Sequence, residues 1–172
     1  MVDPGYRVNE IGERCFERLV GLMLEDGIQP YEIGLIIDTH SHVDHCGASE
    51  AIAASGDDRA LITLSKTEDE YRRGTGLQLH KMIGLPIEDF EPDFFLQEGT
   101  LSFSNKDNRF DLQVIATPGH CPGSISIYDP QNMALITGDA VFNRSVGRTD
   151  FPGGDGKLLM GSIEKLADFD AR

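Results

Sequence analysis

Basic residues are scarce in this chain, which carries 15 lysines and arginines against 29 acidic residues and a net charge of −14 over 172 residues. Nucleic acids and anionic membranes both attract positively charged protein surfaces. We therefore expect no nucleic acid and no membrane among the partners. The surplus acidic residues are interpreted as a solvated surface.

Long apolar runs are also missing. No stretch approaches the roughly 20 residues that a membrane-spanning helix needs, and Met1–Tyr6 lacks the charged and then apolar pattern of a signal peptide. The length suits one domain with one core. We expect a single domain over residues 1–172 and a cytoplasmic location, and we leave open whether the protein forms a homo-oligomer.

Cysteines are few, and they form no closely spaced pair. The three residues are Cys15, Cys46 and Cys121, an odd number that argues against a disulfide framework and fits a reducing compartment. Cys46 and Cys121 each directly follow a histidine. We interpret both as small buried residues in preference to redox groups, because free cysteine often behaves as a small hydrophobe.

Histidine is equally rare, yet three of the five histidines fall within Thr39–His45. An apolar run, Ile33–Ile37, leads into this stretch, and the small residues Gly47–Ser49 follow it. This order predicts a buried strand that ends in a polar loop, which then opens a helix.

The side chains of this loop are those of a metal site. His40 and His42 point the same way if the chain is extended there, because side chains alternate along a strand. Asp44 and His45 lie beyond the bend and can face a second point nearby. Imidazole nitrogen and carboxylate oxygen suit borderline divalent metals. The alternative is a polar loop of unrelated histidines.

Two further loops offer similar ligands. His120 lies in the loop Thr117–Ser124 after the apolar run Leu112–Ala116, and Asp139 follows the predicted strand Met133–Thr137. Loops at the same ends of neighbouring strands can converge on one point. Glycines 119, 123 and 138 allow the backbone to pass close to a ligand.

The rest of the pattern predicts an α/β layered fold, because strands and helices alternate irregularly. His80 lies alone in a helical segment and is interpreted as a surface or core residue. The expected elements are a helix over 9–25 with Asn9 as N-cap and Gly27 as stop, a helix over 48–54, a strand over 59–65, a helical segment over 67–83 interrupted by Gly74 and Gly76, a loop over 85–98, strands over 99–103, 110–116 and 125–128, and a helix over 157–166.

Three ordered motifs together resemble the metallo-β-lactamase superfamily: the HxHxDH stretch at 40–45, the loop Thr117–Ser124, and Gly138–Asp139. Gly147–Asp150 and Phe151–Asp155 are similar to the glyoxalase II-like (hydroxyacylglutathione hydrolase-like) branch, which also includes persulfide dioxygenase-like proteins. The resemblance covers about residues 33 to 165. It implies an αββα sandwich.

The resemblance also implies ligands for one or two Zn²⁺ ions, with iron as an alternative. His40, His42 and His120 would hold the first ion, Asp44 and His45 the second, and Asp139 would bridge both. The first site keeps a position open for water, whose pKa the metal lowers. Asp44 would then act as the catalytic residue that orients the resulting hydroxide or takes its proton.

Two features depart from the family pattern. No histidine follows His120, although the family normally has one more. The turn Val2–Gly5, which normally comes after about two strands, stands at the very start. The chain therefore resembles a copy that lacks the first strands and the last metal-ligand segment. We expect an exposed sheet edge, with lower stability or pairing with another chain.

Despite these departures, the resemblance implies a metal-dependent hydrolase that acts on a small-molecule substrate. It would cleave a thioester, such as an acyl-glutathione-like compound, with metal-bound hydroxide. The alternatives are a persulfide dioxygenase-like enzyme with one iron, and a metal-binding protein without activity. Arg148 is a candidate for contact with an anionic substrate, although a structural pair with Asp150 explains it more simply. Every alternative needs the imidazoles at 40, 42 and 120 to converge.

Overall fold

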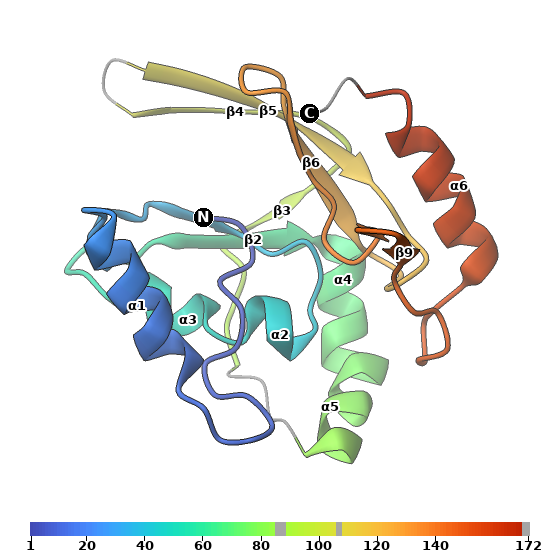
Figure 1. Cartoon of the computed structure of the whole chain (residues 1–172), viewed down its shortest axis with the longest axis horizontal. Helices are drawn as coiled ribbons and strands as arrows, with labels where there is room; N and C mark the ends of the chain where they lie inside the picture. The colour runs from blue at the N-terminus through green and yellow to red at the C-terminus, as the bar shows by residue number, and fades with distance from the viewer. Residues whose placement is uncertain (85–88, 106–107, 170–172) are drawn as a thin grey trace.

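The computed structural model describes residues 1–84, 89–105 and 108–169, which form four layers: helices, a sheet, a second sheet and a helix (Figure 1). The first sheet is parallel, in the order β1 (Leu35–Ile37), β2 (Leu61–Ser65), β3 (Phe94–Leu96). The helices α1 (Cys15–Glu25), α2 (Val43–Cys46) and α3 (Ser49–Ala53) cover its outer face. The expected αββα layering is confirmed.

The second sheet is antiparallel, in the order β4 (Gly99–Asn105), β5 (Asn108–Ala116), β6 (Ile125–Asp129), β7 (Ala134–Ile136). Helix α6 (Gly156–Leu166) lies on its far side (Figure 1). The side chain of Asp155 caps this helix by accepting hydrogen bonds from the backbone N–H groups of Lys157 and Leu158.

Side-chain alternation along the short strands separates three apolar layers. Ile36 and Ile62 face the helices, whereas Ile37, one residue on from Ile36, faces the second sheet. Between the sheets, Ile37 packs with Leu96, Val114, Ile125 and Ile127. Under α6, Ile115 packs with Ala140, Leu159 and Leu166. The two sheets therefore share the apolar layer that lies between them.

A helical segment with an interruption follows β2 in the chain. It comprises α4 (Lys66–Tyr71), η2 (Arg72–Gly76) and α5 (Leu77–Ile83). The expected interruption is confirmed at Gly74, where the backbone leaves helical geometry, but it is wrong for Gly76, which keeps helical dihedral angles (φ −61°, ψ −40°). Smaller elements are the turn η1 (Pro30–Glu32) and a hairpin of β8 (Val141–Phe142) with β9 (Ser145–Val146).

The first three residues lie along the edge of β1. Met1 accepts a hydrogen bond from the backbone N–H of Ile37 at 3.0 Å, and Asp3 donates to the carbonyl of Ile37 at 3.0 Å. The α-amino group of Met1 donates to the carbonyl of Leu35 at 2.8 Å. These bonds cover part of an edge that we expected to be open.

Two further sequence predictions are wrong. Helix α1 begins at Cys15 and not at Asn9. The Asn9 side chain caps only an isolated turn, and the left-handed φ of 81° at Gly12 prevents helical geometry from continuing. Strand β3 lies inside the predicted loop 85–98, of which residues 85–88 fall outside the described residues. The other predicted elements are present with shifted ends. Within the described residues, none of the helices has the length and apolar character that crossing a membrane requires.

Candidate metal centre

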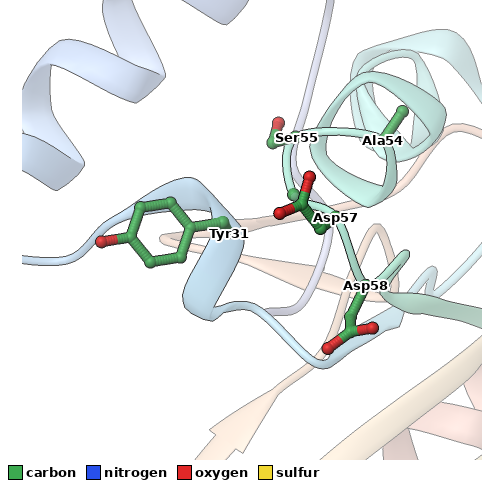
Figure 2. A pocket seen from close by; sticks show the side chains of 6 residues that line it. Tyr31, Ala54, Ser55, Asp57 and Asp58 are labelled. Atoms are coloured by element: carbon green, nitrogen blue, oxygen red, sulfur yellow. The ribbon is translucent and has the colours of Figure 1, made fainter.

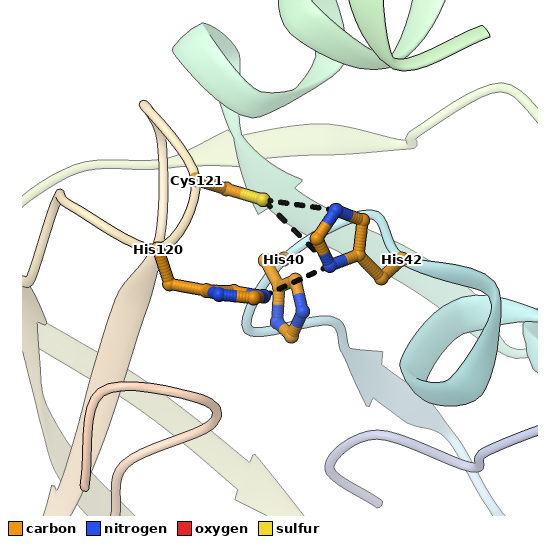
Figure 3. Close-up of side chains that lie close together, drawn as sticks. All are labelled: His40, His42, His120 and Cys121. Atoms are coloured by element: carbon orange, nitrogen blue, oxygen red, sulfur yellow. Dashed lines mark hydrogen bonds between the residues drawn. The ribbon is translucent and has the colours of Figure 1, made fainter. Parts of the chain in front are cut away.

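Three histidines from two sheets meet at one point (Figure 3). His40 and His42 follow β1, and His120 follows β5. The ring centroids lie 4.8 Å apart for His40 and His42, 4.9 Å for His40 and His120, and 4.7 Å for His42 and His120. The predicted convergence of the three imidazoles is therefore present in the structure.

The nitrogen atoms of this cluster fit a cation. His120 Nε2 lies 2.9 Å from His42 Nδ1. His40 is fully buried, and its Nε2 has no hydrogen-bond partner among the described residues. Buried polar atoms are nearly always satisfied, so an orphaned imidazole nitrogen calls for a partner outside the chain. A metal ion at the point where these nitrogens meet would satisfy all three.

Hydrogen bonds on the opposite ring nitrogens set the tautomers. His120 Nδ1 donates to the carbonyl oxygen of Arg148 at 2.7 Å, which leaves its Nε2 lone pair free. Thr39 Oγ1 donates to Asp3 at 2.7 Å and lies 3.1 Å from His40 Nδ1. Because that hydroxyl proton is used, Thr39 accepts from His40, and the His40 Nε2 lone pair is also free.

His40 and His42 are held in the neutral form, which is the form that binds metals. Burial, reinforced by the neighbouring histidines, lowers the pKa of His40 well below its usual value. The same causes lower the pKa of His42 to about 3.

Beside this cluster lies the second predicted ligand set. His45 Nε2 is 3.0 Å from one oxygen of Asp139, whose other oxygen is 3.4 Å from His120 Nε2. Asp139 therefore reaches both histidines, as a bridging carboxylate must. Asp44 lies at the rim, 45% exposed, with its Oδ2 3.7 Å from His45 Nε2.

Asp3 is a site residue that the sequence did not reveal. Its carboxylate accepts from His45 Nδ1 at 2.9 Å and from the Thr39 backbone N–H at 2.7 Å. Burial by itself lowers the pKa of His45, but hydrogen bonds to Asp139 and Asp3 outweigh it and raise that pKa to about 10. The only sequence signal at Asp3 is a turn, because its histidine partner lies 42 residues further on.

Glu68 on α4 joins the two histidine loops. One carboxylate oxygen accepts from the backbone N–H of Ser41 at 3.0 Å and from its hydroxyl at 2.7 Å, and the other accepts from the backbone N–H of Gly123 at 2.9 Å. The side chain is fully buried. Glu68 thereby fixes the spacing between His40 and His42 on one loop and His120 on the other.

A cavity of about 430 Å³ opens onto the centre. It is lined by Tyr6, Glu10, His42, Val43, Asp44, Leu79, His80, His120, Asp139, Arg148 and Phe151. Arg148 forms two hydrogen bonds of 2.7 Å to Asp150 and stacks 3.6 Å above the Phe151 ring. The simpler interpretation of Arg148 as a paired residue agrees with this geometry. His80 is buried, as a core residue would be, yet it lies against the His42 ring.

A second hollow, of about 650 Å³, lies elsewhere, between η1 and the end of α3 (Figure 2). It is lined by Tyr31, Ala54, Ser55, Gly56, Asp57 and Asp58. In the part of the chain that the structure describes, the groups of side chains able to hold a metal ion lie only at the histidine loops and the adjacent Asp139. We therefore place the candidate centre there and not in the larger hollow.

Comparison with known proteins agrees with this geometry. The hydroxyacylglutathione hydrolase GloC of Haemophilus influenzae is 32% identical over 165 residues, which cover 95% of this chain and 70% of that protein. Human mitochondrial persulfide dioxygenase ETHE1 is 31% identical over 138 residues, covering 78% of this chain and 45% of that protein. A solved structure of TTHA1623 in a di-iron-bound form superposes with a TM-score of 0.71 at 32% identity, covering 87% of this chain and 70% of the other.

The family profile described as the metallo-beta-lactamase superfamily matches residues 1–171. This match spans both histidine loops, the Asp139 turn and all four layers of the fold. The chain therefore belongs to the metallo-beta-lactamase superfamily.

Proposed function

We propose that this protein is a metal-dependent hydrolase that cleaves a thioester, with an acyl-glutathione-like compound as the substrate class. The observation that carries the proposal is the convergence of His40, His42 and His120, with the orphaned His40 Nε2 among them. The substrate class is supported by a relative of this chain in Haemophilus influenzae, which is named as a hydroxyacylglutathione hydrolase.

The proposed ligands divide between two sites. The three converging histidines would hold the first ion, Asp44 and His45 the second, and Asp139 would contribute one oxygen to each. When bound, the metal supplies a Lewis acid that polarises the acyl oxygen and activates water. Zinc suits this mainly nitrogen-based ligand set.

The residues around the centre would position the substrate. Val43, Leu79 and Phe151 give the cavity an apolar wall that an acyl chain can contact. Asp44 is half-exposed at the rim, and it would orient the attacking water or take its proton. Arg148 already pairs with Asp150, so an anionic group of the substrate would have to share its guanidinium.

Elemental analysis combined with a thioester hydrolysis assay tests the proposal. The wild-type protein should contain one or two zinc ions per chain and hydrolyse an acyl-glutathione thioester. His42→Ala should lose metal and activity together, because it removes one of the three converging imidazoles. Full metal content in that variant would overturn the assignment.

A persulfide dioxygenase with one iron is the second candidate. Two histidines and one carboxylate form the facial triad of iron oxygenases, and the 3.4 Å contact between His120 and Asp139 places a carboxylate beside the histidine cluster. One iron per chain, with oxygen uptake on glutathione persulfide, would favour this candidate. Full metal content without turnover of either substrate would favour a binding protein.

A further inference from the structure

Cys121 lies against the histidine cluster, although the proposed ligand set does not include it. Its sulfur is 3.4 Å from Nε2 and 3.9 Å from Nδ1 of His42 (Figure 3). The side chain is 1% exposed. The sequence identified this cysteine only as a small buried residue.

We propose that Cys121 is a fourth protein ligand of the first metal site, which makes that site His₃Cys in the resting protein. The inference rests on the proposed metal binding. The ligand atoms of His40, His42, His120 and Cys121 all lie within 4.8 Å of one another. In a tetrahedral zinc site, Zn–S and Zn–N bonds of about 2.3 and 2.0 Å place sulfur roughly 3.5 Å from each nitrogen. The sulfur lies 3.9 Å from His42 Nδ1, the nitrogen that meets His120 Nε2, which is close to that value.

An independent observation points to a ligand at the same place. His40 is 0% exposed, its ring lies between those of His42 and His45, and its Nε2 lacks a hydrogen-bond partner among the described residues. The backbone also holds Cys121 firmly in the loop. Its N–H donates to Ser124 Oγ at 3.2 Å, and its carbonyl accepts from the Gly119 N–H at 3.2 Å.

Cys46 provides the internal contrast. It also follows a histidine and is equally buried. Its sulfur, however, lies 3.3 Å from the carbonyl oxygen of Ser41, and its side chain packs with Ile36 and Ile52 in the core. Neither candidate metal group among the described residues contains it. Burial beside a histidine loop is therefore not enough to place a thiol in the cluster, and Cys121 differs by its position.

Ligation by Cys121 has two chemical consequences. The S–H bond breaks, a sulfur–metal bond forms, and the proton passes to solvent without any change of oxidation state. Four protein ligands would close the coordination sphere, so in this resting form Asp139 would bind only the second ion, and its oxygen and water could reach the first ion only after one of the four ligands leaves. A thiolate also favours zinc over harder ions such as Mn²⁺. Cys121 would thus bias the site toward zinc and hold it in a closed resting form.

Cobalt substitution tests the proposal directly. Co²⁺ would be added to metal-free wild-type protein, Cys121→Ser, Cys121→Thr and the matched control Cys46→Ser. We expect near-ultraviolet sulfur-to-cobalt charge-transfer absorption in the wild type and in Cys46→Ser, and none in the two Cys121 variants. Circular dichroism would verify that each variant is folded. The wild-type spectrum gives a result even if one substitution prevents folding.

Metal competition titrations give a second readout. Loss of groups that merely orient a ligand typically weakens metal binding by about 10–100-fold. Cys121→Ser should therefore weaken Zn²⁺ binding at least tenfold and Mn²⁺ binding by much less. Equal losses for the two ions would overturn the thiolate assignment.

The outcomes separate this inference from the proposed function. Cobalt bound without charge-transfer absorption, or with absorption that survives in both Cys121 variants, overturns the Cys121 ligand and leaves the hydrolase intact. Cysteine-dependent absorption in a protein that cleaves no thioester supports the ligand and overturns the hydrolase. Failure of the wild type to bind cobalt overturns both.

Discussion

The tautomer of each histidine decides whether its metal-facing nitrogen has a free lone pair. The carboxylate of Asp3 controls two of these tautomers from one position. It accepts from His45 Nδ1 directly, and it accepts the Thr39 hydroxyl proton, so that Thr39 in turn accepts from His40. His40 is thereby left with an unprotonated Nε2. His45 has a pKa of about 10 and also donates from Nε2 to Asp139, so its Nε2 would become available only when a metal ion displaces that proton.

Asp3→Asn should therefore weaken zinc binding by about 10–100-fold. The amide nitrogen is a donor where Asp3 Oδ2 is an acceptor, so His45 Nδ1 would have to accept and its Nε2 would carry the proton. Competition with a chromophoric chelator measures the affinity. Asp57→Asn removes one negative charge at an exposed position and should leave the zinc affinity unchanged. Equal losses of affinity in the two variants would show that only net charge matters.

The sequence identifies those site residues that lie close together along the chain or within an ordered motif. His40, His42 and His45 lie within six consecutive residues, and His120 and Asp139 each follow an apolar strand. The role of Asp3 cannot be predicted in this way, because its partners Thr39 and His45 lie 36 and 42 residues away. Cys121 was visible as a residue, but its contact with His42 spans 79 residues and depends on how two sheets pack.

At the scale of secondary structure, the histidine loops are held by the helices next to them. Glu68 on α4 accepts hydrogen bonds from the backbone N–H groups of Ser41 on one loop and Gly123 on the other. Gly119, immediately before His120, has φ 136°, and a Cβ built there would lie 2.3 Å from the backbone nitrogen of Leu159 on α6. The position of each loop thus depends on a helix from another part of the chain.

Glu68→Gln should lower the free energy of unfolding by about 1–3 kcal/mol, because one amide nitrogen would face an N–H donor and leave it unsatisfied in the buried site. Urea denaturation of the metal-free protein measures the change. Glu70→Gln on the exposed face of the same helix should alter stability by less than about 0.5 kcal/mol. A Glu68 variant as stable as the Glu70 variant would refute the role of Glu68 as a brace.

Gly119→Ala should destabilise the protein by about 2 kcal/mol or more, since the new methyl group meets α6 backbone at a left-handed position. Zinc affinity should fall with it, because His120 is the next residue. Gly161→Ala, in the middle of α6, places its new methyl group where no other atom lies within 4 Å, and it should instead stabilise by about 0.5–1 kcal/mol. Thermal melts of the two variants should therefore shift in opposite directions.

Element prediction fails where local pattern and tertiary pairing disagree. Strand β3 is three residues long and follows an acidic, proline-containing segment, so its sequence carries little periodicity. It becomes a strand because Phe95 pairs with Leu64 on buried β2. For β5, a long inner strand of the second sheet, the pattern over residues 110–116 is enough to predict a strand without its partners, and the structure adds two residues at its start.

For the whole molecule, the centre lies where the two sheets meet. His40 and His42 come from the end of β1 in the first sheet, whereas His120 and Asp139 follow β5 and β7 in the second. The sheets already share the apolar layer around Ile37 and Val114. An ion bound by both loops would add a polar link to that apolar contact, so metal binding and folding should be coupled.

Chelation should therefore lower the melting temperature of the whole protein in one transition. A ligand present at 100 times its dissociation constant stabilises the native state by about 2.7 kcal/mol, which corresponds to roughly 5–10 °C for a domain of this size. Differential scanning calorimetry with zinc and with EDTA measures the shift. His42→Ala should show almost none, because it cannot assemble the first site. A zinc-dependent shift of the same size in His42→Ala would mean that the stabilising ion is held elsewhere, and that the two sheets are not joined through the histidine loops.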